Sequence, residues 1–174
     1  MPPDHHPYYC EENIHRLIAS DRLANDAVVV LVTNAHRSVA CWSQRLAPEP
    51  GQAVVWDYHV VAVEPGEARE AARVWDLDSV LEPPCSLDTW LTATFRPGVP
   101  EQLDARFRVV EGALWVAEFA SDRSHMLTED GAWFHPPPPW PPPGGGEGSN
   151  LDRWLDQAVG EWLGLEELWN LLKG

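Results

Sequence analysis

Hydrophobic residues near the start of the chain recur at helical spacing. Ile14, Leu17 and Ile18 occupy positions i, i+3 and i+4, and two acidic residues stand in the first turn, where the helix dipole is positive. The pattern predicts an amphipathic helix over residues 11–20, with Cys10 at its N-terminus.

Short β-branched runs follow this helix and show no helical period. Residues 27–33 and 38–43 are each predicted to form a buried strand. Residues 53–64 and 71–78 are predicted as two further strands, and only a short segment containing Pro-Gly separates them. Neighbouring strands joined in this way are expected to form a hairpin.

The next part of the chain returns to helical spacing. Leu87, Trp90 and Leu91 share one helical face, whereas residues 105–110 are predicted as a strand and residues 113–120 as a short helix. The connections between strands are too short for the crossovers that parallel strands need. We therefore predict an α+β fold with a mainly antiparallel sheet.

A Pro- and Gly-rich tract at residues 136–150 precedes the C-terminal tail. Its polyproline character indicates a surface connector, which we favour over a ligand for a proline-recognition domain. Within residues 151–173, two stripes of Leu and Trp predict helices that dock on the rest of the chain. We therefore expect a single domain over residues 1–174.

The charge balance disfavours several classes of partner. The 174 residues include 12 Lys and Arg against 27 Asp and Glu, a formal net charge of -15, which repels nucleic acids and anionic membranes. No stretch reaches the roughly 20 apolar residues of a membrane span, and residues 1–9 lack the basic and apolar regions of a secretory signal. We expect a cytoplasmic monomer with no nucleic-acid or membrane partner.

The three cysteines, Cys10, Cys41 and Cys85, are an odd number and show no CxxC spacing. This pattern predicts neither a disulfide framework nor a thiolate zinc site. Cys41 is flanked by apolar positions and Cys85 follows a diproline, so both are interpreted as packing residues.

The histidines show no metal-ligand spacing of the HExxH type. His5 and His6 are expected to lie in a frayed terminus, and His36, His125 and His135 form no such motif. We therefore expect no metal and no cofactor.

A cysteine at the start of a helix is a candidate nucleophile. Unsatisfied backbone amides and the helix dipole stabilise a thiolate, which predicts a lowered pKa for Cys10. Glu11 and Glu12 oppose this shift, so a cationic partner would be needed. The alternative is a small buried residue with no chemical role.

His59 lies in the middle of the strand predicted for residues 53–64. Alternation places Asp57, His59 and Val61 on one face of that strand and Trp56 on the other. A histidine among valines needs a partner. It is either a core histidine bonded to a backbone carbonyl or a catalytic base.

The following predicted strand carries two acids on one face, Asp76 and Asp78. An acid within a strand is unusual unless it is paired, and a hairpin can bring such an acid beside His59. Together with Cys10 these residues would supply a nucleophile, a base and an orienting acid. Alternation alone does not distinguish Asp76 from Asp78.

Residues 121–126, with the sequence SDRSHM, are dense in polar groups beside a predicted helix end. Ser121 and Asp122 could contact a ligand, or the segment could be a hydrogen-bonded turn. The residue types favour neither interpretation over the other.

Long and unusual sequence strings surround the candidate residues. They are YYCEENI around Cys10, VVWDYHVV around His59, VWDLDSVLEPPC around Asp76, and FASDRSHM followed by GAWFHPPPPW. In order and spacing these strings resemble the protein N-terminal glutamine amidohydrolase family, from Tyr8 to the C-terminus. The very short N-terminal extension, the Pro- and Gly-rich tract and the tail after Asn150 depart from the family.

The resemblance implies a catalytic triad of Cys10, His59 and Asp76. It also implies a fold similar to the papain and transglutaminase group of α+β cysteine enzymes, in which the nucleophile opens a helix and the other two residues occupy adjacent strands. The implied reaction converts the N-terminal glutamine of a protein or peptide to glutamate and releases ammonia through a thioester.

A substrate with a free N-terminus would need an acceptor for its α-ammonium group. Glu11, Asp57 and Asp122 are the candidate acceptors, and Ser121 is a further candidate for substrate binding. Two other functions stay open. One is a transglutaminase-like acyltransferase, in which an amine resolves the thioester, and the other is a non-catalytic interaction module of a protein-degradation (N-degron) pathway that uses the Trp-rich tail and the proline tract.

Overall fold

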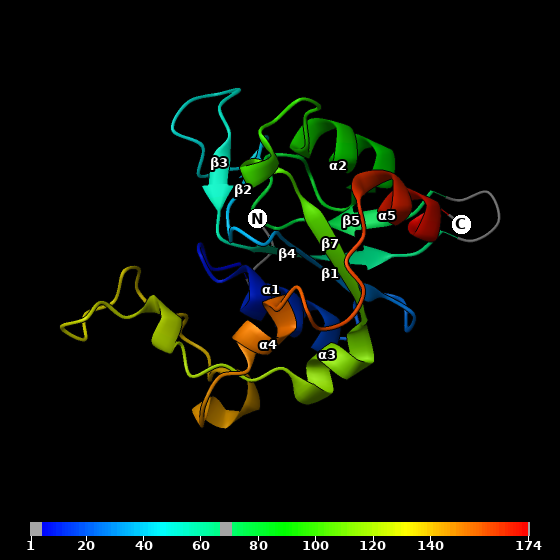
Figure 1. The fold of residues 1–174 in the computed structure, drawn as a ribbon. Coiled ribbons are helices and arrows are strands. Elements are labelled where there is room, and N and C mark those ends of the chain that lie inside the picture. The colour runs from blue at the N-terminus through cyan, green and yellow to red at the C-terminus, as the bar shows by residue number, and fades with distance from the viewer. Residues whose placement is uncertain (1–4, 67–70, 174) are drawn as a thin grey trace.

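The computed structural model describes residues 5–66 and 71–173 and has helices on both faces of a central sheet (Figure 1). The sheet has five strands in the order β6-β5-β4-β1-β7, and β2 and β3 form a separate two-stranded sheet. Every strand pairing in these two sheets is antiparallel. The predicted α+β fold with a mainly antiparallel sheet is therefore confirmed.

The helices and strands follow the hydrophobic pattern of the sequence closely. The helices are α1 (Cys10–Ala19), α2 (Leu87–Thr94), α3 (Gly112–Glu118), α4 (Leu151–Leu155) and α5 (Leu165–Leu172). The strands are β1 (Val28–Thr33), β2 (Val39–Cys41), β3 (Val54–Trp56), β4 (His59–Glu64), β5 (Arg73–Trp75), β6 (Cys85–Ser86) and β7 (Arg106–Glu111). None of the helices in the described ranges is long and apolar enough to cross a membrane.

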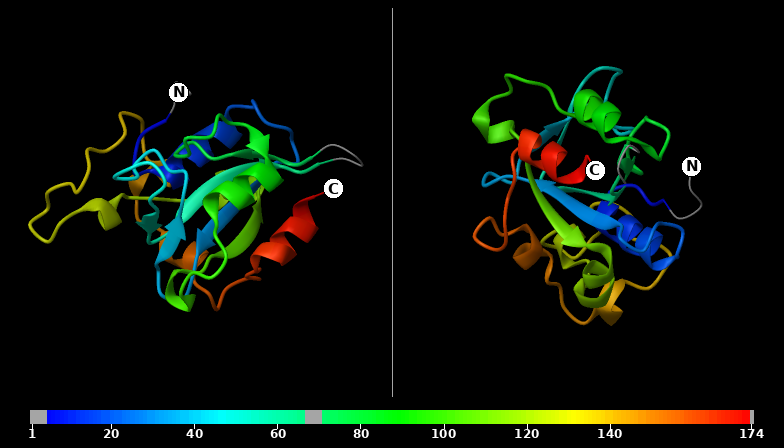
Figure 2. Two further views of the ribbon diagram at one scale, coloured as in Figure 1. Left: turned by 90° about the horizontal axis from the view of Figure 1, so that it is seen from above. Right: turned by 90° about the vertical axis from the view of Figure 1, so that its right-hand side faces the viewer.

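The central strands β1 and β4 are buried because helices cover both faces of the sheet (Figure 2). Val60 and Ala62 belong to the hydrophobic cluster that contains α1, α3 and α4. Val61 and Val63 belong to the cluster that contains α2 and α5. This alternation fixes the direction of every side chain on β4, including that of His59 at its start.

The predicted strand over residues 53–64 is wrong in one respect, because the chain turns within it. β3 ends at Trp56 and β4 begins at His59, and Asp57 Oδ1 accepts a hydrogen bond from the Tyr58 amide at 3.0 Å in the turn between them. The turn interrupts the two-residue period, so the rings of Trp56 and His59 stack 5.9 Å apart and do not lie on opposite faces.

The predicted hairpin between β4 and β5 is confirmed by the pairing of Ala62 with Trp75 and Glu64 with Arg73. Part of its connection, residues 67–70, lies outside the described residues, as do residues 1–4 of the segment in which no secretory signal was found. β5 ends at Trp75, so the two acids that follow it are not strand residues as predicted.

The C-terminal helices bury their apolar faces on opposite sides of the sheet. Trp154 and Leu155 of α4 pack in the cluster with α1, and Leu168 and Leu172 of α5 pack in the cluster with α2. The first of the two predicted stripes is helical only over α4, because the chain turns after Leu155.

Candidate active site

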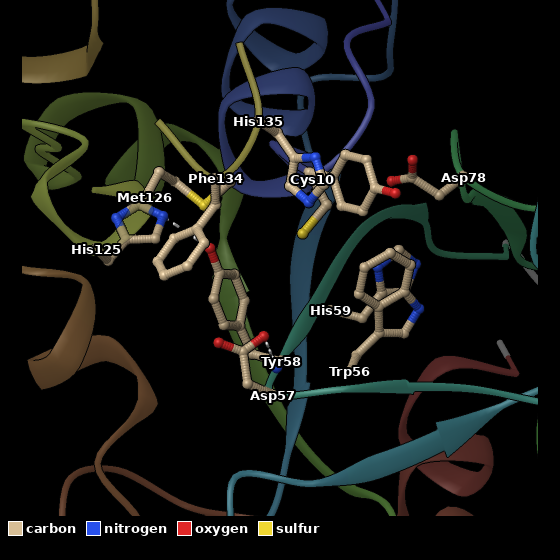
Figure 3. Close-up of a pocket in the computed structure, with 11 residues that line it drawn as sticks. Cys10, Trp56, Asp57, Tyr58, His59, Asp78, His125, Met126, Phe134 and His135 are labelled. Atoms are coloured by element: carbon tan, nitrogen blue, oxygen red, sulfur yellow. Dashed lines mark hydrogen bonds between the residues drawn. The ribbon is translucent and has the colours of Figure 1, made fainter. Parts of the chain in front are cut away.

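A pocket of about 280 Å³ opens where β4 begins and α1 starts (Figure 3). Both Cys10 and His59 line it, although their sequence positions lie far apart. In Figure 3, Trp56 and His59 lie on one side of Cys10, and Tyr58 and His125 lie on the other. The complete lining consists of Tyr8, Cys10, Trp56, Asp57, Tyr58, His59, Asp78, His125, Met126, Phe134 and His135.

Cys10 is the first residue of α1, and its thiol is buried against β4. Burial raises the pKa of the Cys10 thiol well above its usual value, and the negative charges of Glu11 and Asp78 raise it further, although a hydrogen bond from the Val60 backbone opposes them. The lowered pKa predicted from the helix N-terminus is therefore wrong. Desolvation and two carboxylates outweigh the helix dipole here.

His59, the first residue of β4, pairs with Asp76, which directly follows β5. Ala62 pairs with Trp75 in the hairpin, which brings the residue after Trp75 close to the start of β4. His59 Nε2 lies 2.9 Å from Asp76 Oδ1, and both side chains are 1% exposed. The bond through Nε2 leaves Nδ1 as the ring nitrogen that can exchange a proton within the pocket.

The two buried groups stabilise each other's charged forms. Burial alone would lower the pKa of His59, but Asp76 raises it above the usual histidine value, with smaller contributions from Asp78 and Glu11. Burial opposes ionisation of Asp76 as well, yet the pKa of this carboxyl is lowered by His59. Asp76 is therefore held as a carboxylate, and it stabilises the positive charge of His59 whenever the ring takes up a proton.

Two further donors fix the second oxygen of the Asp76 carboxylate. Gln44 Nε2 donates to Asp76 Oδ2 at 3.2 Å, and Trp90 Nε1 of α2 donates to it at 3.0 Å. Gln44 Oε1 in turn accepts from Trp56 Nε1 at 3.3 Å. Because Trp56 also stacks on His59, one hydrogen-bonded ring of side chains sets both the tilt and the position of the imidazole.

Asp78 has a different partner. Its Oδ1 lies 2.8 Å from His5 Nε2, and both side chains are 3% exposed. Residues 5 and 6 are therefore not a frayed terminus as predicted, because His5 packs at the edge of the pocket and His6 Nε2 bonds to the Pro136 carbonyl at 2.8 Å. The sequence pattern missed this contact because it joins residues 73 positions apart.

A second group of polar side chains lies on the other side of Cys10. Glu11 is fully buried, and its Oε2 accepts a hydrogen bond from the Cys10 thiol at 3.6 Å. His125 Nε2 lies 3.6 Å from Glu11 Oε1 and 3.3 Å from the Tyr58 hydroxyl. Burial would lower the pKa of His125, but Glu11 raises it above the usual histidine value.

Sequence reasoning had set aside His125 and His135, which both line the pocket. The strings FASDRSHM and GAWFHPPPPW contain these two histidines, and the family resemblance of the strings was the signal in the sequence that could have identified them as site residues. Their side chains reach the pocket only because the segment after α3 folds back across α1, a contact that no short-range pattern encodes.

Ser121 and Asp122 do not line this pocket. Ser121 Oγ accepts a hydrogen bond from the Arg123 amide at 3.1 Å, and Asp122 Oδ1 accepts from the amide and hydroxyl of Ser124 at 2.9 and 2.6 Å. These bonds form a turn, which was one of the two interpretations of the segment. Of the four candidate substrate-binding residues, only Asp57 lines the pocket, whereas Glu11 is buried against the Cys10 thiol.

Carboxylates and an imidazole also come close enough to hold a cation. Single ligand atoms of His59, Asp76 and Asp78 all lie within 4.8 Å of one another. Each of these side chains already has a hydrogen-bond partner, since His59 bonds to Asp76, Asp76 to Gln44, and Asp78 to His5. A cation at this position would have to displace these bonds.

Comparison with known proteins adds to this geometry. The model of the family described as N-terminal glutamine amidase matches residues 5–170. A relative from Arabidopsis thaliana, named protein N-terminal glutamine amidohydrolase, is 38% identical over 141 residues, which cover 74% of this chain and 63% of that protein.

Relatives of the same name occur in other eukaryotes. The protein from Oryza sativa subsp. indica is 33% identical over 94% of this chain and 77% of its own length, and the human protein is 35% identical over 74% and 65%. The match thus spans slightly less than two thirds of the Arabidopsis and human proteins.

Proposed function

Because the chain belongs to the N-terminal glutamine amidase family, we propose that it hydrolyses the side-chain amide of an N-terminal glutamine. The substrates are proteins and peptides with a free N-terminal glutamine, and the products are N-terminal glutamate and ammonia. The observation that carries the proposal is one pocket lined by a cysteine at a helix start and by a histidine paired with a buried aspartate.

In the proposed first step, Cys10 is the nucleophile. Its proton passes to His59 Nδ1, and the thiolate attacks the side-chain carbonyl carbon of the substrate, which forms a C–S bond. The negative charge on the carbonyl oxygen is stabilised by the Cys10 backbone amide at the start of α1. The imidazolium of His59 then protonates the nitrogen, the C–N bond breaks, and ammonia leaves a thioester behind.

In the second step, water replaces the thiolate. His59 Nδ1 takes a proton from the water, whose oxygen attacks the thioester carbon. The C–S bond breaks, the sulfur regains its proton from His59, and the product carries a carboxyl group. Asp76 acts throughout by orienting the ring and stabilising its positive charge through Nε2.

Recognition of the free N-terminus is assigned to acidic groups beside Cys10. Glu11 is the proposed acceptor of the α-ammonium group, and Asp57, which is exposed at the pocket, adds negative charge near it. Ser121 and Asp122 are not part of this proposal, because their oxygens are committed to a turn away from the pocket.

The proposal extends to the fold group and to the domain. A helix that carries the nucleophile and packs on β4, with the histidine at the start of β4 and the aspartate directly after β5, supports a papain- and transglutaminase-like core. We propose that residues 1–174 act as one catalytic domain and as a monomer, with 136–150 as connector and 151–173 as docked helices. Three free cysteines support a reducing compartment, and the cytoplasm and an N-degron pathway are the proposed setting.

The decisive experiment is a peptide that begins with glutamine. Incubation with the protein should change the mass of its first residue from Gln to Glu and release an equal amount of ammonia. An unchanged peptide after long incubation with correctly folded protein would refute the proposed function.

A second candidate, an acyltransferase of the transglutaminase type, shares the thioester. Adding a primary amine to the same assay separates the two, because an acyltransferase would give the substituted amide at the expense of glutamate. A non-catalytic module would release no ammonia in either assay.

A further inference from the structure

The carboxylate of Glu11 has an unusual position for an enzyme that needs a thiolate. It lies against the nucleophile, with Oε2 accepting from Cys10 Sγ at 3.6 Å, and the side chain is fully buried. A negative charge at this distance disfavours a second negative charge on the sulfur. The empty site therefore keeps Cys10 in its protonated, weakly nucleophilic form.

The other oxygen of Glu11 lacks a hydrogen bond. Among the described residues, none donates to Glu11 Oε1, which is a costly condition for a buried carboxylate. His125 Nε2, at 3.6 Å, is beyond hydrogen-bond distance, and its side chain is 25% exposed. Arg123 donates from both Nε and Nη2 to Glu12, so this pair of guanidinium donors is not directed at Glu11.

Charged and titratable groups surround Glu11 from every element that packs near it. Cys10 and Glu12 lie beside it on α1, Asp57 and Tyr58 precede β4, and His125 and Arg123 come from the segment after α3. His125 is the group that places a positive charge near Oε1, and it does so at 3.6 Å without a hydrogen bond. Oε1 is buried behind His125, which lines the pocket, so a cation that enters from the pocket beside this ring could supply the missing charge-assisted hydrogen bond.

We infer that Glu11 keeps the Cys10 thiol protonated in the empty site, and that the α-ammonium group of the substrate activates the thiol by pairing with Glu11. This rests on the proposed function for the identity of the cation. When the ammonium binds Oε1, the charge that opposes the thiolate is neutralised. The S–H bond then breaks, an N–H bond forms at His59 Nδ1, and no other proton moves.

This arrangement links recognition to chemistry. A free N-terminus is the feature that distinguishes the substrate from internal glutamines, and the same positive charge prepares the nucleophile. An internal glutamine that entered the pocket would bring no cation, so Cys10 would remain a thiol. The empty enzyme is also protected from alkylation and oxidation, which need the thiolate.

The test measures the apparent pKa of Cys10 by the ultraviolet absorbance of its thiolate across a pH series, with Cys10→Ala as the blank for the other two cysteines. The probe is glycinamide, which carries an α-ammonium group but no glutamine side chain. N-acetylglycinamide, which has no charge, is the matched control. We expect glycinamide to lower the apparent pKa in the wild-type protein and to raise the thiolate fraction at neutral pH about tenfold.

Glu11→Gln should lower the apparent pKa of Cys10 without any probe, and glycinamide should then have no further effect. Glu166→Gln makes the same chemical change at an exposed position on α5 and should leave the thiol pKa at its wild-type value. Because the glycinamide titration of the wild-type protein needs no variant, misfolding of Glu11→Gln would not prevent the test.

Two outcomes would overturn the inference. One is an unchanged thiol pKa in wild-type protein saturated with glycinamide, and the other is an equal response to glycinamide and to its acetylated control. Failure of the proposed function is distinguishable, because a protein that never deamidates Gln peptides can still show the glycinamide shift. Conversely, an active enzyme without that shift would refute only this inference.

Discussion

Arg123 and Glu12 form a bidentate ion pair between the segment after α3 and the first turn of α1. Nε lies 2.8 Å from Oε1 and Nη2 lies 2.8 Å from Oε2, and the side chains are 9% and 0% exposed. The remaining guanidinium donors reach the carbonyls of Pro138 and Trp140. One arginine therefore fastens the proline tract to the helix that carries Cys10.

Replacing Arg123 should destabilise the protein strongly, because Glu12 would become a buried charge without a cation beside it and would keep only the hydrogen bond from Trp140 Nε1. We expect Arg123→Met to lower the free energy of unfolding by about 3–5 kcal/mol in urea titrations. Arg37→Met is the control, since the Arg37–Asp152 pair is 38% and 101% exposed and should contribute less than about 1 kcal/mol. Equal losses in the two variants would contradict a structural role for the buried pair.

Cys10→Ala should abolish ammonia release while the protein stays folded, because alanine fits the space but has no nucleophilic sulfur. Cys41→Ser and Cys85→Ser are the controls and should keep most of the activity. Cys41 is fully buried, so its serine variant is expected to lose stability. Substantial ammonia release by Cys10→Ala would eliminate the covalent mechanism.

Asp76→Asn should reduce kcat by orders of magnitude, since an amide does not stabilise the imidazolium of His59. Asp78→Asn should have a much smaller effect, because Asp78 bonds to His5 and not to His59. Steady-state kinetics of both variants on a Gln peptide check the ranking. The reverse order would assign the orienting role to Asp78.

The His59–Asp76 pair also predicts a dependence of stability on pH. The raised pKa of His59 means that its contribution is complete below the ordinary value of 6.5 and is lost as pH rises through the folded-state pKa. The lowered pKa of Asp76 means that its contribution is present above 3.8 and is lost as pH falls further. The difference in unfolding free energy between wild type and Asp76→Asn should therefore be largest in mildly acidic buffer and shrink in alkaline buffer. A difference that stays constant across this range would contradict the pairing.

Periodicity in the sequence was sufficient to predict most of the fold. In α1 and in the hairpin of β4 and β5, the local residue preferences agree with the hydrophobic pattern, so these elements could be predicted. The break between Trp56 and His59 could not be, because a two-residue turn does not disturb the average hydrophobicity of the run.

The residues that the sequence missed are those held by distant contacts. Arg123 and Glu12 stand 111 positions apart, and His125 reaches the pocket from a single 3-10 turn, Ser124–Met126, in the segment after α3. No local rule predicts the direction of such side chains. The raised pKa of Cys10 was missed for a related reason, since helix position can be inferred from sequence whereas burial against β4 cannot.

The choice among glutamine-containing substrates is the sharpest prediction of the proposed function. A site that fixes both the α-ammonium group at Glu11 and the side-chain amide at Cys10 measures the distance between them. N-terminal asparagine is one methylene shorter, so its carbonyl carbon cannot reach the sulfur. The lost packing alone would cost only about 1–3 kcal/mol, but a displacement of about 1 Å from the attack geometry can lower the rate by a further factor of roughly 100.

Internal glutamine, N-acetylated glutamine and pyroglutamate should fail for another reason, because none carries a primary ammonium to pair with the buried carboxylate. Parallel ammonia-release assays on these four peptides and on a Gln-initiated peptide should give turnover only with the last. Comparable turnover of the internal-glutamine peptide would show that the α-ammonium group is not required, and the activity would then be general protein deamidation or transamidation.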